Sequence, residues 1–357
     1  MKKGILFVPF MTGKGGTEAV IHNLFKSINR EKINLIVYSI GGSDNYEWTQ
    51  GVPTYIQHIS NKRLIRTAYY STLLPLKICQ IIKKEQPDFV ISTNPVMWFL
   101  AKQSVKILHF SIPVISWYHY SLLQKPIKPF LLKSADAFLA ISSGIKNQLI
   151  NLGQASSKIY LIYNPVVSDY HLIPRPVHGT KFIYLGRVDY DQQKNVQELI
   201  HACKGLKGEW KLSIYGDSKK ANQLKVLIDQ LKLSSHIQWE GFINNPWEKI
   251  GNVSALLLTS KYEGLPMVLC EAISHGVFII SSDIETGPAD IINKNNGKLY
   301  ESGNVDRLHQ IMQSIIDKSK VLPNQKQIIE SSKLFSVEKY GRRFTDAILS
   351  ILDKYKH

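Results

Sequence analysis

The chain has 357 residues, of which 44% are hydrophobic, and it carries a formal net charge of +16. This length exceeds what one hydrophobic core usually serves and suits two domains of about 150 residues each. Three cysteines without a CxxC pair exclude a disulfide framework and a cysteine zinc site, and they fit a reducing cytoplasm. No uninterrupted apolar run approaches 18 residues, so we expect no membrane-spanning helix.

The positive charge is concentrated in the first half of the chain. Residues 1–165 hold 19 Lys and Arg against 7 Asp and Glu, a net charge of +12, whereas residues 166–357 hold 25 against 21, a net charge of +4. A basic half suits an anionic partner, either nucleic acid, an acidic sugar or a membrane surface. A generally basic proteome would explain the total charge but not its uneven distribution.

Short β-rich runs alternate with helical patterns in the first half, which predicts a parallel sheet with crossover helices. The opening MKKGILFVPFMT resembles a short signal peptide, but TGKGG follows in place of a cleavage site, so we interpret it as a first strand. The predicted elements are a strand at 5–10, a helix at 19–28, a strand at 34–40, a long helical stretch through 63–84, and strands at 88–93, 113–118 and 137–142.

The pattern restarts after the proline-rich segment NPVVSDYHLIPRPVHGT (164–180), which is the candidate linker. Strands are predicted at 181–188, 211–217, 236–243, 254–260 and 277–283, with helices near 193–203 and 219–231. We therefore expect an α/β protein with two doubly wound domains, 1–165 and 166–335, on either side of a cleft. No strand follows the last helical stretch, 336–357, and we expect it to pack back on the first domain.

The segment KYEGLPMVLCEAISHG (261–276) follows a predicted strand directly, which is where open parallel sheets bind ligands. Glu263 lies in the loop, and a helix with Pro266 in its first turn contains Glu271. Backbone N–H groups at the start of this helix would be available to an anion, most simply a diphosphate. These N–H groups belong to Leu265, Met267 and Val268.

The two glutamates of this segment have three interpretations. The paired carboxylates of glycoside hydrolases stand about 5–9.5 Å apart, whereas eight residues of helix rise about 12 Å. Contacts to two ends of one extended ligand therefore suit Glu263 and Glu271 better than a hydrolytic pair. A capped surface helix with incidental acids is the third interpretation.

A second strand-to-loop segment, YLGRVDYDQQKNV (184–196), supplies Arg187 and Lys194. A guanidinium fork and a flexible ammonium together suit a pyrophosphate leaving group, whose charge grows as the bond to it breaks. Solvated loop charges are the alternative interpretation.

Two weaker motifs lie in the first half. In MTGKGGTE (11–18), Gly15 and Gly16 permit close approach of backbone to a ligand at the start of a helix, although a plain tight turn would look the same. In SWYHYS (116–121), His119 ends an apolar strand, where an imidazole can exchange a proton near neutral pH. A purely structural histidine would give the same pattern.

The combined pattern resembles the retaining, nucleotide-sugar-dependent glycosyltransferases of family 4, which have two Rossmann-like domains in the GT-B fold. The matching features are an E-x7-E motif at Glu263 and Glu271, a diphosphate clamp at Arg187 and Lys194, GDS at 216–218 in place of GDG, and a glycine loop at 15–18. Within the family, LAISSGIKNQLI, IYNPV, LLLTSKYEGLPM and SSDIETGPADII resemble the lipopolysaccharide core 1,6-galactosyltransferases, which transfer galactose from UDP-galactose to a core glucose.

The resemblance implies specific roles for the candidate residues. Arg187 and Lys194 would hold the diphosphate, Glu271 the ribose hydroxyls and Glu263 the donor sugar. His119 would contact the transferred sugar, and it forms the implied catalytic set with Glu263, Arg187 and Lys194. The remaining implied nucleotide-sugar contacts are Gly15, Gly16, Gly216, Phe242, Ile243, Gly264, Leu265, Pro266, Met267 and Val268, with Phe242 and Ile243 at the uracil. No metal or other cofactor is implied.

Two positions depart from the family pattern. Val268 stands where galactosyltransferase relatives often have threonine, which bears on donor identity. Ser218 replaces the second glycine of GDG, and a serine can still approach a ligand through its backbone.

The implied function is retaining transfer of a hexose, galactose in the first instance, from a UDP-sugar to a lipopolysaccharide or lipooligosaccharide core. The alternatives are a transferase of capsule or other surface polysaccharide that uses UDP-glucose or UDP-N-acetylglucosamine, a sugar-nucleotide epimerase, and a nucleic-acid-binding protein. The basic first half would bind a lipid-linked oligosaccharide at the cytoplasmic face of the inner membrane, with no nucleic-acid partner. Residues 61–84 would form an interfacial helix there, or an ordinary helix that covers the sheet.

Overall fold

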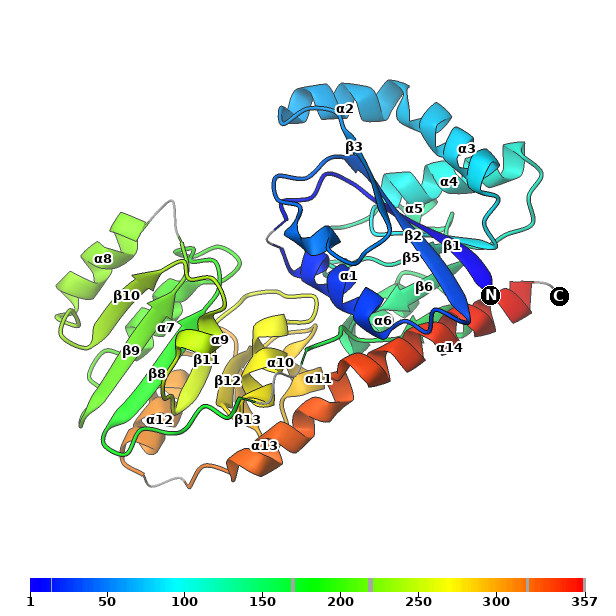
Figure 1. Ribbon diagram of the computed structural model, residues 1–357. Coiled ribbons are helices and arrows are strands. Elements are labelled where there is room, and N and C mark those ends of the chain that lie inside the picture. Colours follow the sequence, from blue (N-terminus) through cyan, green and yellow to red (C-terminus); the bar gives the residue numbers. More distant parts are fainter. Residues whose placement is uncertain (14, 168–170, 218–220, 319–320, 356–357) are drawn as a thin grey trace. The chain divides into compact units, whose positions relative to one another are not determined.

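The computed structural model describes residues 1–13, 15–167, 171–217, 221–318 and 321–355. Ser218, which the resemblance places beside the donor, lies outside these residues. The chain divides into two compact units, Met1–Val166 with Phe335–His357, and Val167–Leu334 (Figure 1).

The first unit is built on a parallel sheet of seven strands in the order β3-β2-β1-β4-β5-β6-β7. Strand β1 lies inside the sheet and is buried from Gly4 to Val8. The chain runs from β1 through β2 to the edge strand β3, then returns to the other side of β1 with β4 and continues outward to β7. This order defines a doubly wound sheet. The strands are β1 Lys2–Val8, β2 Ile33–Gly41, β3 Thr54–His58, β4 Phe89–Ser92, β5 Val114–Ser116, β6 Ala137–Ala140 and β7 Ile159–Leu161.

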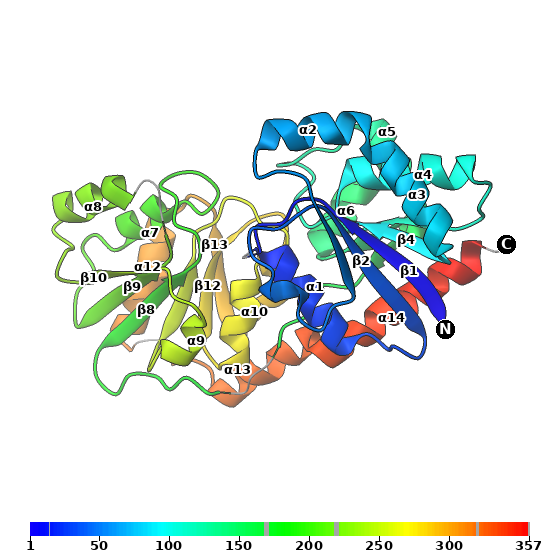
Figure 2. The ribbon, with the colours of Figure 1, turned by 45° about the horizontal axis from the view of Figure 1, so that its top comes forward.

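The helices of the first unit cover the sheet and include the end of the chain. The helix α14 lies beside α1, as Figures 1 and 2 both show. The approach is so close that a Cβ on Gly341 would lie 2.2 Å from the Ser27 carbonyl oxygen. The helices are α1 Gly16–Ser27, α2 Arg63–Thr72, α3 Leu74–Glu85, α4 Pro95–Ile107, α5 Pro129–Leu132, α6 Ser143–Asn151 and α14 Val337–Tyr355.

The predicted helical stretch through 63–84 is two helices, α2 and α3, that meet at Leu73. Pro75 lies in the first turn of α3. Because proline has no backbone N–H, it cannot continue the hydrogen-bond ladder of the preceding helix, whereas a first turn tolerates it.

The second unit has a parallel sheet of six strands in the order β10-β9-β8-β11-β12-β13, which is again doubly wound. Its strands are β8 Thr180–Leu185, β9 Trp210–Tyr215, β10 Ile237–Gly241, β11 Ala255–Leu258, β12 Phe278–Asp283 and β13 Gly297–Glu301. Its helices are α7 Val196–Ala202, α8 Ala221–Gln230, α9 Pro246–Lys249, α10 Met267–Ser274, α11 Pro288–Ile291, α12 Val305–Ile316 and α13 Gln325–Ser332. The predicted α/β class with two parallel, Rossmann-like sheets is confirmed.

Three strands that the sequence analysis does not identify, β3, β7 and β13, all lie at sheet edges. β3 has no buried residue, β13 has two buried residues, Gly297 and Tyr300, that are not adjacent, and β7 has three residues. An edge strand is covered on fewer sides, so its sequence lacks the continuous apolar run that marks a central parallel strand.

Within the described part of the chain, no helix combines the length and apolarity needed to cross a membrane.

Candidate active site

The loop after β8 is organised by one carboxylate. Asp189 accepts hydrogen bonds from the backbone N–H groups of Lys194 and Asn195, each at 3.0 Å. Asn195 has a φ of 49°, a left-handed conformation that asparagine tolerates. The loop therefore folds back on itself and fixes the position from which the Lys194 side chain extends.

Lys194 forms an ion pair with Glu263, which lies in the loop after β11. The distance from Nζ to Oε1 is 2.6 Å, and the side chains are 16% and 9% exposed. The Ser260 hydroxyl donates to the same carboxylate oxygen at 2.6 Å. Charges so far removed from water persist because each satisfies the other.

Arg187 joins this pair through Gln193. The Arg187 guanidinium, 65% exposed, donates to Gln193 Oε1 at 2.8 Å. Gln193 Nε2 donates to the Tyr262 carbonyl at 3.1 Å and lies 3.5 Å from Glu263 Oε2. The structure thus brings Arg187, Lys194 and Glu263 into one connected cluster, with most of the guanidinium facing solvent. We call Arg187, Gln193, Lys194 and Glu263 the cationic cluster.

The start of α10 lies just beyond Glu263. Pro266 is the N-cap residue and not the first helical residue, and no side chain among the described residues caps the first-turn N–H groups. The Thr286 hydroxyl donates to the Glu263 carbonyl. A Cβ on Gly287 would lie 3.0 Å from the carbonyl oxygen of Gly264, so the two loops touch. Of the predicted contacts, Leu265 and Pro266 are buried, whereas Met267 and Val268 are partly exposed.

Glu271 lies in α10, a little more than one turn from its start. Trp247 Nε1 donates to Glu271 Oε2 at 3.0 Å. Part of the residue reaches the surface, but its carboxyl lies among protein atoms, and this desolvation raises the pKa of Glu271 even though the indole hydrogen bond acts in the opposite direction.

Gly216 follows β9 and cannot be replaced without displacing the backbone. Its φ is +148°, and a Cβ there would lie 1.9 Å from the carbonyl oxygen of Gly186. Its N–H donates to the Gly241 carbonyl at 2.7 Å. The glycine therefore lets the loops after β8, β9 and β10 converge.

Phe242 and Ile243 follow β10, which ends at Gly241, two residues before the predicted strand end. Phe242 is 51% exposed and Ile243 is partly exposed. Trp239 Nε1 donates to the Gly216 carbonyl at 2.9 Å and holds this end of β10 beside the loop after β9.

In the first unit, Gly15 and Gly16 begin α1. Glu18 in the first turn accepts hydrogen bonds from Thr12 Oγ1 at 3.0 Å and from the Gly13 N–H at 2.9 Å. A Cβ on Gly15 would lie 2.5 Å from Glu18 Oε2, whereas one on Gly16 would meet nothing within 4 Å. A side chain on Gly15 would therefore have to move the Glu18 carboxylate, whereas one on Gly16 would not.

His119 lies in the loop after β5, because the strand ends at Ser116 and not at residue 118 as predicted. Its ring lies 4.7 Å from that of Trp117, and its buried Nε2 has no partner among the described residues. Burial lowers the pKa of His119 to about 3. Burial therefore favours the neutral ring near pH 7, in which form it offers a ligand a hydrogen bond, and proton exchange by His119 stays a prediction.

Sequence reasoning missed the residues that hold the named side chains in place, namely Asp189, Gln193, Ser260, Thr286 and Trp247. Asp189 belongs to a DYD triplet, and an aspartate shortly after a strand often accepts loop N–H groups. The others carry no such signal. Among the described residues, no group of three or more His, Cys, Asp or Glu side chains could hold a metal ion.

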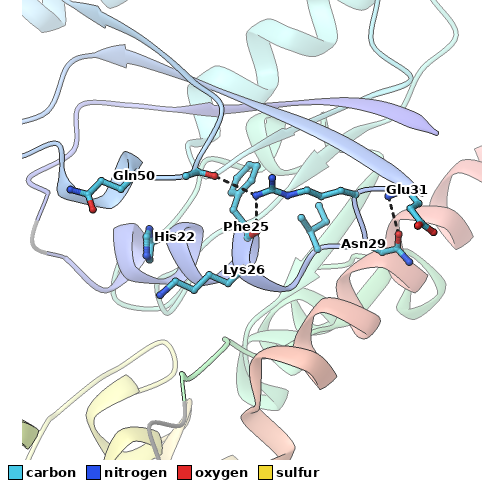
Figure 3. Close-up of a pocket in the computed structure, with 9 residues that line it drawn as sticks. His22, Phe25, Lys26, Asn29, Glu31 and Gln50 are labelled. Atoms are coloured by element: carbon cyan, nitrogen blue, oxygen red, sulfur yellow. Dashed lines mark hydrogen bonds between the residues drawn. The ribbon is translucent and has the colours of Figure 1, made fainter.

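A pocket of about 790 Å³ opens beside the end of α1 in the first unit (Figure 3). Its Arg30 guanidinium donates to the backbone carbonyls of Phe25 and Gly51 at 3.2 and 3.4 Å. The pocket contains none of the candidate site residues.

Comparison with known proteins identifies the class to which this fold and site belong. Residues 14–170 match the family described as Glycosyltransferase Family 4, and residues 174–335 match Glycosyl transferases group 1. The chain belongs to glycosyltransferase family 4 and has the GT-B fold.

Individual relatives span the whole chain. The lipopolysaccharide 1,6-galactosyltransferase of Escherichia coli strain K12 is 35% identical, over 97% of this chain and 98% of that protein. The lipopolysaccharide outer core galactosyltransferase WaaB, in its apo form, is 31% identical with a TM-score of 0.85, over 97% of this chain and 99% of that one. Anabaena Alr3699/HepE in complex with UDP shares the fold, with a TM-score of 0.80 at 16% identity, over 98% and 100% of the two chains. The predicted resemblance is confirmed, and the protein is a glycosyltransferase.

Proposed function

We propose that this glycosyltransferase moves galactose from UDP-galactose to the core oligosaccharide of lipopolysaccharide, with retention of anomeric configuration. The observation that carries the proposal is the cationic cluster beside the start of α10. There, Lys194 and Arg187 come together with the start of a helix, and no side chain in the described part of the chain caps the first-turn N–H groups of that helix. Such a site suits a departing diphosphate.

Charge stabilisation of the leaving group is the main catalytic contribution in this proposal. As the bond between the anomeric carbon and the diphosphate oxygen breaks, negative charge grows on UDP, and Arg187, Lys194 and the α10 amides stabilise it. The acceptor hydroxyl attacks the anomeric carbon of an oxocarbenium-like state from the face that UDP leaves, which retains the configuration, and its proton passes to the departing diphosphate oxygen. Each such donor is worth about 3–4 kcal/mol in other enzymes. His119, as a neutral ring, would contribute a hydrogen bond to the transferred sugar.

The remaining donor contacts follow the same proposal. Glu271 would accept hydrogen bonds from the ribose hydroxyls, Glu263 would contact the sugar, and Phe242 and Ile243 would contact the uracil. Val268 stands where galactosyltransferase relatives often have threonine, so the choice between galactose, glucose and N-acetylglucosamine is decided by experiment. Galactose is favoured by the two lipopolysaccharide galactosyltransferases to which the chain is similar along its length.

A donor and acceptor panel tests this function. Purified protein is incubated with UDP-galactose, UDP-glucose or UDP-N-acetylglucosamine, with and without a truncated lipopolysaccharide core, and products are resolved by mass spectrometry and NMR. We expect an α-linked galactoside only when UDP-galactose and the core are both present. A β-linked product would exclude retention, and another preferred donor would support a transferase of a different surface polysaccharide.

The same protein preparation tests for an epimerase and for a nucleic-acid-binding protein. Isomerised sugar nucleotide without acceptor would identify an epimerase. Salt-sensitive binding of duplex DNA, together with no detectable affinity for UDP, would identify a nucleic-acid-binding protein.

We further propose that the first unit binds the lipid-linked acceptor at an anionic membrane surface through α2 and the start of α3. None of the residues of α2 is buried, and Leu64 and Leu76 are 84% and 63% exposed. Residues 61–84 contain six Lys and Arg and no Asp or Glu. Exposed leucines among cations suit the interface of a membrane that contains anionic lipid.

Vesicle sedimentation tests the membrane contact. We expect the protein to bind vesicles that contain phosphatidylglycerol better than vesicles of phosphatidylcholine alone, and binding to fall as salt rises. Leu64→Ser combined with Leu76→Ser should abolish most of this binding, whereas Leu152→Ser, at an exposed leucine of the same unit, should not. Equal binding by all three proteins would exclude this surface.

A further inference from the structure

The short helix α9 contacts α10 through one tryptophan. Trp247 donates from Nε1 to Glu271 Oε2 at 3.0 Å, and its ring stacks on the imidazole of His275 with centroids 5.0 Å apart and planes 23° from parallel. Glu271 lies in α10, and His275, four residues later, is the C-cap residue of that helix, so the two side chains lie on the same side of it. His275 Nδ1 is in turn 2.7 Å from the His171 carbonyl oxygen, which makes Nδ1 the donor. The indole is therefore held by its face and by its edge.

The hydrogen bond from Trp247 occupies only one of the two oxygens of the Glu271 carboxylate. An ionised carboxylate can accept several hydrogen bonds on its two oxygens. Oε2 accepts the indole N–H, and Oε1 accepts no hydrogen bond from the described residues. The indole therefore fixes the rotation of the carboxylate and leaves one oxygen available to a hydroxyl of a ligand.

Trp247 also ends the segment that carries Phe242 and Ile243. This segment begins after Trp239, whose Nε1 donates to the Gly216 carbonyl at 2.9 Å, and it turns at Asn245, which has a φ of 49°. The loop is thus anchored by an indole hydrogen bond on each side. Any group that the loop contacts is held at a fixed position relative to the Glu271 carboxylate.

We infer that Trp247 is a positioning residue for the nucleotide: it orients Glu271 toward the ribose hydroxyls and fixes the distance between that carboxylate and the loop that meets the base. The inference rests on the proposed use of a UDP-sugar. A purely structural role would be packing between α9 and α10, which has no connection to the ribose.

Binding to the full-length protein by calorimetry separates these roles. The ligands are UDP and its 2′-deoxy and 3′-deoxy analogues. The variants are Trp247→Phe, Glu271→Ala, which removes the acceptor of the indole N–H, and the two combined. We expect Trp247→Phe to weaken UDP binding about tenfold, the loss typical of one hydrogen bond to a charged group. The loss of affinity should be smaller for at least one deoxy analogue, and the combined variant should lose no more UDP affinity than Glu271→Ala alone.

Trp210→Phe is the matched control. Trp210 also stacks on a histidine of the second unit, His236, with centroids 4.5 Å apart, but its Nε1 has no hydrogen-bond partner in the described structure. The Trp210→Phe variant should bind UDP with the affinity of the wild type. Trp247→His keeps a ring N–H and should retain more UDP affinity than Trp247→Phe, which provides a second measurement if the phenylalanine variant does not fold.

Three results would overturn the inference. The first is wild-type UDP affinity in Trp247→Phe. The second is an equal loss for UDP and both deoxy analogues, and the third is additive losses in the combined variant. Failure of the wild-type protein to bind UDP at all would instead overturn the UDP-sugar function, and this inference with it.

Discussion

The Nζ of Lys194 lies 2.6 Å from Oε1 of Glu263, and this contact joins the loop after β8 to the loop after β11. These strands are neighbours in the second sheet, so the carboxyl ends from which the loops start are adjacent. An ammonium has three N–H donors. Lys194 can therefore remain paired with Glu263 while it also donates to a diphosphate.

Loss of this cation should affect stability and activity separately. Lys194→Ala leaves the Glu263 carboxylate largely buried without its partner, which typically costs about 3–5 kcal/mol when a buried pair is broken. It should also reduce transfer at least about tenfold, because one charged donor to the leaving group is gone. Thermal unfolding and initial rates measure the two effects.

The variant Lys194→Ala with Glu263→Ala is the control for that experiment. Removing both charges should recover most of the lost stability but none of the activity. Wild-type turnover in Lys194→Ala would show that Lys194 does not contact the leaving group.

The sequence predicts the central strands from their apolar runs, and it predicts the candidate site residues from their positions after those runs. Buried parallel strands such as β11 are continuous apolar runs, and a charged residue that follows one directly, as Glu263 follows β11, is placed at the ligand-binding edge by topology alone. Edge strand β3 lacks that run. Gln193 and Thr286 contact loops distant in sequence, and Trp247 joins α9 to α10. Periodicity carries no information about such contacts.

Burial of His119 predicts a specific pH dependence of stability. The pKa of His119 is about 3 in the folded protein and 6.5 when the ring is exposed. Below pH 6.5 the unfolded chain therefore binds a proton at this ring, whereas the folded chain does not. This contribution to stability is present above pH 6.5 and falls as pH drops toward about 3, by at most about 1.4 kcal/mol per pH unit. His119→Gln should therefore lose less stability than the wild type between pH 7 and pH 5.

His109→Asn is the control, because His109 is exposed and asparagine tolerates its φ of 53°. Stability is measured as the midpoint of urea unfolding at each pH. Between pH 7 and pH 5, the midpoints of His109→Asn should change with pH as those of the wild type do. If His119→Gln does so as well, the ring is accessible to protons, as proton transfer by His119 requires.

Glu271→Gln should raise the stability of the fold at pH 7 and lower the transfer activity. The raised pKa of Glu271 means that the folded protein holds a proton that the unfolded chain releases above pH 4.5, so ionisation destabilises the fold as pH rises from that value. Glutamine is neutral and can accept the Trp247 N–H through its amide oxygen. Melting temperatures should be higher than wild type at pH 7 and should converge with it near pH 4.5, while transfer falls about tenfold or more. A lower melting temperature at pH 7 would show that the surroundings stabilise the charge.

Gly16→Ala tests whether the start of α1 contacts the substrate. A methyl group there meets no atom within 4 Å, and alanine favours a helix over glycine by up to about 1 kcal/mol, so the fold should be unchanged or slightly stabilised. If a donor or acceptor group passes over this backbone, the methyl group will obstruct it and raise the KM for that substrate with no loss of thermal stability. Gly15→Ala is the contrasting variant, because its Cβ would displace Glu18 from Thr12 and Gly13 and should lower both stability and activity. Wild-type KM and kcat in Gly16→Ala would assign this glycine to the turn alone.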